Sequence, residues 1–489
     1  MIDSKYLTLR NILLLSLFLR SIMIFVMGGG YLHPDAQWQY LEPAFKYAKG
    51  FGALPWEFNS QFGGARSWII PGCIYILLKC FLFLKIDDPF LWIYTLRFFL
   101  ALLSLVSIYS IFHITKILDN ERTAYLAALY AAVWGFFAFF NLQLHGEMIA
   151  IAFVLLAHLF CLKASSYPDH PRLKQLYLGM MSGISLGFVF VAKYHVAVFG
   201  FTLLGYLLFK KKYVSAFMFC IGVMMVILIQ GIVDYFTWHK FLASFFNYYH
   251  DVTGEDTAKP FYTYIGYTVK ILSPILFPCI LFYFYHSFKK LNLIHFSLVL
   301  YFIIHSLVGH KLLRYISPIT PFFFILIPIG YFYFFKNTLL SETAQIRLKK
   351  LTYSLFFIAL IPQYIPPFLS PFLNYPYQYP HWTKNSELVK ATYIVGKQQD
   401  STGVMYINRD DTGYFYLNKN IPIYTGGSEK QTIKTLINIH LNLNYIVYKK
   451  NEKDPITTQD LKDILNEHWE IFKEMKEHII FRKTVKVSL

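Results

Sequence analysis

Long apolar runs are the feature that most limits what this 489-residue chain can fold into. Runs of about 17 to 25 apolar residues, the length that crosses a bilayer as a helix, recur over residues 1–367. Hydrophobic residues make up 56% of the chain and charged residues 15%, against roughly 25% charged in soluble domains. The sequence therefore predicts an all-α polytopic membrane protein with about 11 to 13 spans, without the alternation of a membrane β-barrel.

The positive charge is spread between the apolar runs. The formal net charge is +17, but no single basic block carries it, which disfavours nucleic-acid binding. Basic loops mark the cytoplasmic side, and we assign to it residues 114–122, 163–174, 210–213, 287–293 and 336–350. The external side then receives residues 28–66, 141–147, 190–195, 234–264, 309–314 and the chain after about 367. Segment 67–85 fits this alternation if it is re-entrant or lies partly in the membrane plane, and the alternative is that one short loop breaks the charge rule.

The composition predicts two domains. Residues 1–367 form the transmembrane domain, with external loops at 28–66 and 234–264, and residues 380–489 are polar and lysine-rich. In this tail, β-like runs (403–407, 421–424, 444–448, 478–485) alternate with helix-like runs (384–398, 428–440, 458–474), which predicts a small α/β domain. The five cysteines all lie in or beside apolar segments, where small packing residues are expected.

The loop after the first span carries the first candidate site. Asp35 follows His33 and Pro34, and a carboxylate at the exit of a span is a functional candidate by default. Residues 35–49 predict a helix along the membrane surface, with Trp38, Leu41, Phe45 and Ala48 on its apolar face and Gln37, Gln39, Glu42, Lys46 and Lys49 on its polar face. Asp35 is either a catalytic base, with its proton affinity tuned by His33, or the N-cap of this helix.

Cationic side chains on the predicted external side form the second candidate site. If the segment from His310 to Arg314 is helical, His310, Lys311 and Arg314 share one face and form a phosphate clamp. The alternative is that these side chains snorkel to lipid headgroups. Lys193 and His195 interrupt the apolar run 175–209, which indicates either a functional cation or the junction of two helices.

Further polar residues on the same side suit recognition of the sugar and the acceptor, and we assign to this role His33, Arg66, Glu147, His195, Asp234 and Trp238. Glu147 begins another apolar run and is expected to hold a sugar hydroxyl or to pair with Lys193 or Arg66. Asp234 and Trp238 begin the long loop 234–264, where aromatic and polar groups can bind a sugar, although Trp also populates any membrane interface.

These motifs resemble those of glycosyltransferase family 22, the mannosyltransferases that build GPI anchors and the N-glycan precursor. The resemblance covers about residues 8–335. It rests on His33-Pro34-Asp35, on Gly50-Phe51-Gly52 with Pro55-Trp56-Glu57 and Arg66-Ser67, and on His310-Lys311 followed by Arg314-Tyr315 and Pro318. Lys193 stands where that family often has arginine, and Ala36 stands where it usually has a second acid.

The resemblance implies a GT-C fold, a polyprenyl-phosphate sugar donor, inversion at the anomeric carbon, no metal and no other cofactor. Asp35 matches the family's catalytic aspartate. We therefore expect transfer of a hexose, with mannose the first choice, to a lipid-linked glycan or glycolipid, in the bacterial inner membrane or the ER membrane. The active site and the tail face the periplasm or lumen. The alternatives are a flippase or transporter of a lipid-linked sugar, and a glycan ligase with a diphosphate-linked donor.

Overall fold

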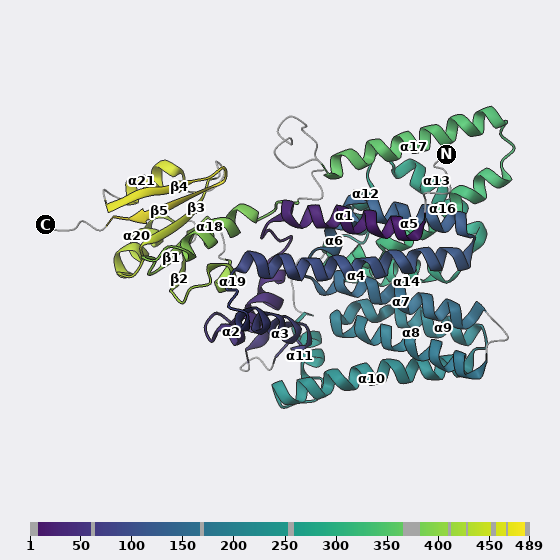
Figure 1. Cartoon of the computed structure of the whole chain (residues 1–489), viewed down its shortest axis with the longest axis horizontal. Helices are drawn as coiled ribbons and strands as arrows, with labels where there is room; N and C mark the ends of the chain where they lie inside the picture. Colours follow the sequence, from purple (N-terminus) through teal and green to yellow (C-terminus); the bar gives the residue numbers. More distant parts are fainter. Residues whose placement is uncertain are drawn as a thin grey trace. The chain divides into compact units, whose positions relative to one another are not determined.

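The fold was analysed in a computed structural model, which describes residues 8–59, 64–166, 171–252, 259–364, 382–408, 412–426, 429–450, 456–465 and 468–484. Two compact units emerge from its contacts (Figure 1). Unit 1 comprises residues 1–25, 63–69 and 97–382, and unit 2 comprises residues 26–62, 70–96 and 383–489. The expected domain boundaries at 367 and 380 lie outside the described residues.

Unit 1 is helical. Its helices are α1 (Leu9–Met27), α4 (Pro89–Leu118), α5 (Glu121–Val133), α6 (Gly135–Asn141), α7 (Gly146–Ser166), α8 (Arg172–Ala192), η4 (Tyr194–Val198), α9 (Phe199–Phe209), α10 (Tyr213–Trp238), α11 (Ala243–Val252), α12 (Thr263–Leu272), α13 (Phe277–Ser287), η5 (Phe288–Lys290), α14 (Leu293–Leu307), α15 (Leu313–Ile316), η6 (Ser317–Ile319), α16 (Thr320–Asn337) and α17 (Glu342–Tyr364), with α1 and α4 each running on into unit 2.

Six of the described helical segments are long and apolar enough to cross a membrane, and two bent pairs would raise the number to eight. The pairs are α5 with α6, bent by 66°, and α12 with the α13–η5 segment, bent by 104°. Three shorter apolar helices accompany them, namely Ile69–Phe83, Tyr194–Phe209 and Leu293–Leu307. The multi-span membrane architecture is therefore confirmed, and the higher predicted count requires that the shorter helices cross as well.

Close helix packing in unit 1 depends on small residues. A Cβ added at Gly179 of α8 would lie 2.4 Å from the carbonyl oxygen of Ser215, and one at Gly183 would lie 2.0 Å from that of Phe219. Both carbonyl groups belong to α10, so glycines four residues apart in α8 let the two helix backbones come into contact. This contact fixes α8, whose last turn leads into Lys193.

Unit 2 combines the first loop, a short apolar helix and the C-terminal domain. Its elements are η1 (Gln37–Leu41), α2 (Glu42–Lys49), η2 (Trp56–Phe58), α3 (Ile69–Phe83), α18 (Ser386–Gly396), β1 (Val404–Ile407), α19 (Gly413–Leu417), β2 (Ile423–Thr425), α20 (Lys430–Ile439), β3 (Tyr445–Lys449), α21 (Thr458–Leu465), β4 (Trp469–Glu474) and β5 (His478–Lys483), with the first residue of α3 in unit 1.

The C-terminal domain contains a five-stranded sheet with the order β2-β1-β3-β5-β4. The first three strands are parallel, and the last two pair antiparallel. Alternate side chains enter two separate cores. Met405 and Ile446 pack with α20 and α21, whereas Val404 and Val447 pack with α18. Helices therefore cover both faces, which confirms the α/β prediction. Residues 469–474 were expected to be helical and instead form β4.

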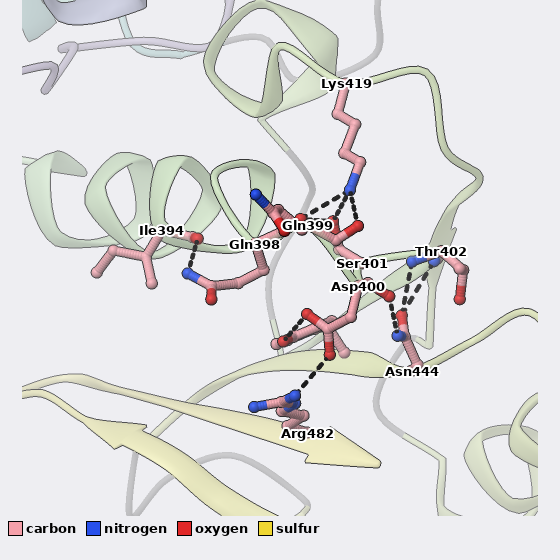
Figure 2. Close-up of polar contacts among 11 residues, drawn as sticks. Ile394, Gln398, Gln399, Asp400, Ser401, Thr402, Lys419, Asn444 and Arg482 are labelled. Carbon is pink, nitrogen blue, oxygen red and sulfur yellow. Dashed lines mark hydrogen bonds and ion pairs between the residues drawn. The ribbon is translucent and has the colours of Figure 1, made fainter. Parts of the chain in front are cut away.

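The turn between α18 and β1 is held by polar contacts (Figure 2). Lys419 Nζ donates to the carbonyl oxygen of Gln398 and the hydroxyl of Ser401, each at 2.7 Å. Asp400 pairs with Arg482 of β5 at 2.8 Å, and Asn444 donates to the Asp400 carbonyl at 2.6 Å. These contacts tie the start of the domain to its central strands.

The helix expected at 35–49 exists, but three of the five residues predicted for its polar face are buried, whereas Lys46 and Lys49 are partly exposed. It begins with the π-helical turn η1 and continues as α2. Gln37, Gln39 and Glu42 are buried, because their side chains bind within unit 2. Gln37 Nε2 donates to Glu42 Oε1 at 2.6 Å, and Gln39 Nε2 donates to Glu57 Oε1 at 3.1 Å. The first half of the helix is therefore packed against protein on the face that was expected to meet water.

Candidate active site

A buried group of charges in unit 1 is built around Glu147, the second residue of α7. Glu147 Oε1 lies 3.5 Å from Lys193 Nζ and 3.7 Å from Arg314 Nε. The side chains are 1%, 4% and 7% exposed, in the same order. Both distances exceed a normal hydrogen bond, so the contacts are ion pairs. We call these three residues the charge cluster. It carries one net positive charge.

Local backbone structure brings the charge cluster together. Lys193 is extended, with φ −163°, and separates α8 from the 3₁₀-helix η4. Arg314 lies in α15, which follows the extended residue Leu312. Glu147 occupies the first turn of α7, where an acid is favoured by the helix dipole. Of the two pairing partners expected for Glu147, Lys193 and Arg66, the structure brings Lys193 to its carboxylate.

The ring of Tyr248, in α11, connects a further cation, Arg66, to the charge cluster. The guanidinium of Arg66 lies 4.5 Å from the centroid of the Tyr248 ring, and Lys193 Nζ lies 5.9 Å from it. Burial raises the pKa of the Tyr248 phenol, so the ring faces these cations in its neutral form. A third cation, Arg66, thus approaches the charge cluster through the Tyr248 ring.

The end of α10 and helix α11 support Arg66. The external loop expected from residue 234 begins later, because α10 continues to Trp238. Trp238 Nε1 donates to the Arg66 carbonyl oxygen at 3.1 Å, and Asn247 Nδ2 donates to that of Gly64 at 3.3 Å. Asp234 Oδ2 accepts from the amide and hydroxyl of Ser244 at 3.1 and 2.5 Å. The contacts of Trp238 and Asp234 are thus those of residues that fix the loop.

The expected clamp around residue 311 is not formed as predicted. Residues 310–312 are not helical, so His310, Lys311 and Arg314 do not share a helix face. Lys311 Nζ donates to the carbonyl oxygens of Val308 and Lys259, at 2.5 and 3.1 Å. The ring of His310 lies 5.8 Å from that of Tyr315, centroid to centroid. Of the three cations, the structure places Arg314 in the charge cluster.

Histidines line the same region of unit 1. His195 packs with the rings of Tyr315 and His305, at 5.0 and 5.3 Å between centroids. His145 is 1% exposed and lies two residues before Glu147. The helix junction expected at 193–195 is thus present, and it also carries a buried cation.

Asp35 lies in unit 2, where its carboxylate contacts His33. Asp35 Oδ1 is 3.0 Å from His33 Nδ1, and the Asp35 side chain is 19% exposed. The amides of Gln37 and Trp38, which an N-cap at position 35 would bind, donate to the Pro34 carbonyl at 2.8 and 3.0 Å. Helix capping therefore does not require the Asp35 carboxylate.

Comparison with known families decides the relationship. Residues 12–378 match the model of the Alg9-like mannosyltransferase family. The chain belongs to this family. The predicted resemblance to glycosyltransferase family 22 is thereby confirmed. A Candida albicans relative, GPI mannosyltransferase 3, is 24% identical over 62% of this chain and 60% of its own length.

Two shorter matches agree with the family. GPI mannosyltransferase 4 of Saccharomyces cerevisiae is 32% identical over 21% of this chain, and GPI mannosyltransferase 3 of Drosophila melanogaster is 38% identical over 21%. The matched segments span 20% and 17% of those relatives. The chain therefore aligns with less than two thirds of the length of each of these relatives.

Solved structures share the fold of this family member. ArnT from Cupriavidus metallidurans bound to undecaprenyl phosphate superposes with a TM-score of 0.61 at 11% identity, over 97% of this chain and 98% of ArnT. An Archaeoglobus fulgidus oligosaccharyltransferase gives 0.51 at 11% identity, over 89% of this chain and 69% of that chain. The predicted GT-C fold is confirmed.

Sequence reasoning about this family member missed several buried polar residues. Asn141, Gln143 and His145 alternate with apolar residues before Glu147, and all three are at most 5% exposed. Tyr248 was also missed, because aromatic residues are common in any membrane protein. The signal available in the sequence was a polar residue at every second position of 141–147.

Proposed function

We propose that the chain transfers a hexose, with mannose the first choice, from a polyprenyl phosphate to a hydroxyl of a lipid-linked glycan or glycolipid. The charge cluster of Glu147, Lys193 and Arg314 carries this proposal. The family of the chain and its GPI mannosyltransferase relatives support mannose as the sugar. The undecaprenyl phosphate named for ArnT supports a polyprenyl phosphate as the donor class.

The buried cations are the part of the site suited to the donor phosphate. Lys193 and Arg314 share one carboxylate, so the charge cluster attracts an anion. A phosphate gains charge as the sugar leaves, and cations fixed in advance stabilise that charge without reorganising. We assign the phosphate to Lys193 and Arg314, with Arg66 beside them on Tyr248. His310 remains a further candidate, and we leave out Lys311 because it binds backbone carbonyls.

Asp35 is the proposed base. It accepts the proton of the acceptor hydroxyl as that oxygen bonds to the anomeric carbon. The bond from this carbon to the phosphate oxygen breaks, and its electron pair leaves with the phosphate. Attack opposite the leaving group inverts the anomeric carbon. His33 is placed to orient the Asp35 carboxylate, at 3.0 Å. Positioned bases of this kind contribute about 10² to 10⁴ in rate.

The remaining assignments are also proposals. We place the reaction and the C-terminal domain on the periplasmic or lumenal side, in keeping with the charge of the loops. Glu147 and His195 face the sugar in this proposal, whereas Trp238 and Asp234 act by fixing the loops around Arg66. We expect no metal or other cofactor.

One observation favours the transporter alternative: the apolar pair α5 and α6 is bent by 66° at a break, and transporters use broken helices. The break between α5 and α6 is, however, filled by protein groups. Phe136 N donates to Gln363 Oε1 at 3.1 Å, Arg20 Nη1 donates to the Ala132 carbonyl at 3.1 Å, and Tyr364 donates to the Val133 carbonyl at 2.8 Å. A break sealed in this way is better suited to shaping a fixed site than to moving a substrate.

Transfer by the purified protein tests the proposal. Wild type, Asp35→Asn, Lys193→Met and the control Asp87→Asn would receive radiolabelled polyprenyl-phosphate mannose and a glycolipid extract. Asp87 lies in unit 2 with its side chain 49% exposed, so its variant matches Asp35→Asn in chemistry. We expect wild type and Asp87→Asn to transfer label, Asp35→Asn to bind donor without transfer, and Lys193→Met to bind donor weakly.

Two results would contradict the proposal. Turnover by Asp35→Asn at the wild-type rate would reject the base. Movement of the donor across liposome bilayers, with no transfer from any polyprenyl-phosphate hexose, would replace the enzyme with a flippase.

A further inference from the structure

The segment that carries Asp35 is bound on both sides by the C-terminal domain. Upstream of it, the Tyr31 amide donates to the Lys384 carbonyl at 3.1 Å, and Asn385 Nδ2 donates to the Tyr31 carbonyl at 3.0 Å. Tyr416 of α19 donates its hydroxyl hydrogen to the Gly29 carbonyl at 2.8 Å. All of these residues belong to unit 2.

The glycines before Asp35 permit this close contact. A Cβ at Gly29 would lie 2.2 Å from Val389 Cγ1, and one at Gly30 would lie 2.4 Å from the Lys384 carbonyl oxygen. A side chain at either position would push the start of α18 away from the loop. Gly29 and Gly30 are thereby explained as the surface on which the C-terminal domain packs.

Downstream of Asp35, Glu42 makes the corresponding contact. It is fully buried, and its Oε1 accepts from Phe415 N and from Gln37 Nε2, each at 2.6 Å. One carboxylate oxygen thus joins α19 to the π-helical turn that follows Asp35. Such turns are rare and need support from their surroundings. Gln39, held by Glu57, supplies a second support for the same turn.

Aromatic packing surrounds this contact. Phe45 of α2 lies 5.9 Å from Phe415, and Phe51 lies 6.3 Å from Tyr414, measured between ring centroids. Trp92 lies 5.7 Å from Phe415. The loop, the start of α4 and α19 therefore share one packed core, in which a displacement of α19 moves the loop.

We infer that the C-terminal domain positions the catalytic base, with Glu42 and Tyr416 as positioning residues on either side of Asp35. The inference rests on the proposed function for the identity of the base. It gives the C-terminal domain a role in the transfer step, in addition to any role in presenting the acceptor.

Tyr416→Phe tests the inference in the intact protein, because it removes only the hydroxyl that binds Gly29. Tyr448→Phe is the matched control. It removes a buried hydroxyl of the same domain that donates to a backbone carbonyl, that of Ile456, at 2.9 Å. Both tyrosines are 1% exposed. Glu42→Ala serves as a second, stronger variant.

Two measurements are made on each variant, namely transfer kinetics and amide hydrogen exchange of residues 29–42. Tyr416→Phe is expected to lower kcat about 2- to 10-fold, the range given by loss of one hydrogen bond, with the donor KM unchanged and faster exchange. Glu42→Ala is expected to act in the same direction and more strongly. Tyr448→Phe is expected to change neither quantity.

The outcomes separate this inference from the proposed function. If Tyr416→Phe and Glu42→Ala behave like Tyr448→Phe in both measurements, the positioning role is rejected. If wild type transfers no sugar, or Asp35→Asn transfers normally, the proposed function fails, while hydrogen exchange still reports whether the domain holds the loop. An unchanged exchange with a raised donor KM would also overturn the inference.

Discussion

Lys193 Nζ lies 3.5 Å from Glu147 Oε1, and the two side chains are only 4% and 1% exposed. Glu147 begins α7, and Lys193 follows the end of α8, so the pair joins two helices at their ends. Because Arg314 approaches the same oxygen at 3.7 Å, removal of the carboxylate affects two cations at once.

Glu147→Gln is therefore expected to be more destabilising than Lys193→Met. The first change deprives two buried cations of their shared carboxylate, whereas the second leaves Glu147 paired with Arg314. Breaking a buried ion pair costs about 3 to 5 kcal/mol. Thermal unfolding in detergent measures the order, and equal melting temperatures for the two variants would show that Arg314 does not share the carboxylate.

Gly413→Ala is expected to destabilise unit 2. Gly413 has φ +66°, and a Cβ there would lie 2.4 Å from Glu42 Oε1. Left-handed backbone at a non-glycine residue costs of order 1–3 kcal/mol, and the steric contact adds to it. Gly72→Ala is the control, because Gly72 sits inside α3 and no atom of the described residues lies within 4 Å of a Cβ added there.

At Gly72, alanine should stabilise the helix by roughly 0.5–1 kcal/mol. Opposite shifts in melting temperature are thus expected from the same chemical change. A Gly413→Ala protein as stable as wild type would mean that the approach of α19 to Glu42 is not tight.

Acid is expected to weaken the joint between α18 and β5. Burial alone would raise the pKa of Glu387, but hydrogen bonds from His478 and from the amides of Glu477 and His478 outweigh it and lower the pKa. A lowered pKa in the folded state stabilises the protein above the ordinary pKa of 4.5, and this stabilisation is lost as the pH falls below it.

Melting temperatures between about pH 6 and about pH 3.5 measure this effect, since the range spans the ordinary carboxyl pKa. Glu387→Gln should melt lower than wild type at the upper end, and the difference should shrink towards the lower end. A difference that does not depend on pH would assign the contact to packing rather than to charge.

Apolar periodicity and loop charge predicted the membrane fold, because those patterns follow from bilayer thickness and lipid polarity. The α/β tail was predicted from alternation, but Trp469–Glu474 was assigned to a helix. Its burial follows no clean two-residue period, and a register shift interrupts it. An edge strand of this kind is fixed by pairing with β5, which is a tertiary contact.

The candidate site was predictable where a single charged residue stands in or beside an apolar run, because burial of an unpaired charge is unfavourable. Glu147 stood out as a charge at the head of one apolar run and Lys193 as an interruption of another, and their pairing was one of the alternatives expected for Glu147. Gln37 and Glu42 were wrongly expected to face water. Their burial depends on α19, and Phe415 of α19 lies 373 residues after Glu42 in the chain. Local periodicity carries no information on such a partner.

Trp238 is expected to act on donor binding through the backbone of Arg66. Its Nε1 donates to the Arg66 carbonyl at 3.1 Å, and a Cβ at Gly64 would lie 2.2 Å from its ring, so the indole both binds and packs against the loop. Trp238→Phe keeps part of the packing and removes the hydrogen bond, which contributes about 0.5–1.5 kcal/mol. If Arg66 binds the donor phosphate, the donor KM should rise about 2- to 10-fold with little change in kcat.

Trp56→Phe is the control, because Trp56 is 51% exposed, and it should leave both constants unchanged. A fall in kcat at constant KM would instead place Arg66 in the transfer step, where its charge stabilises the departing phosphate rather than the bound donor.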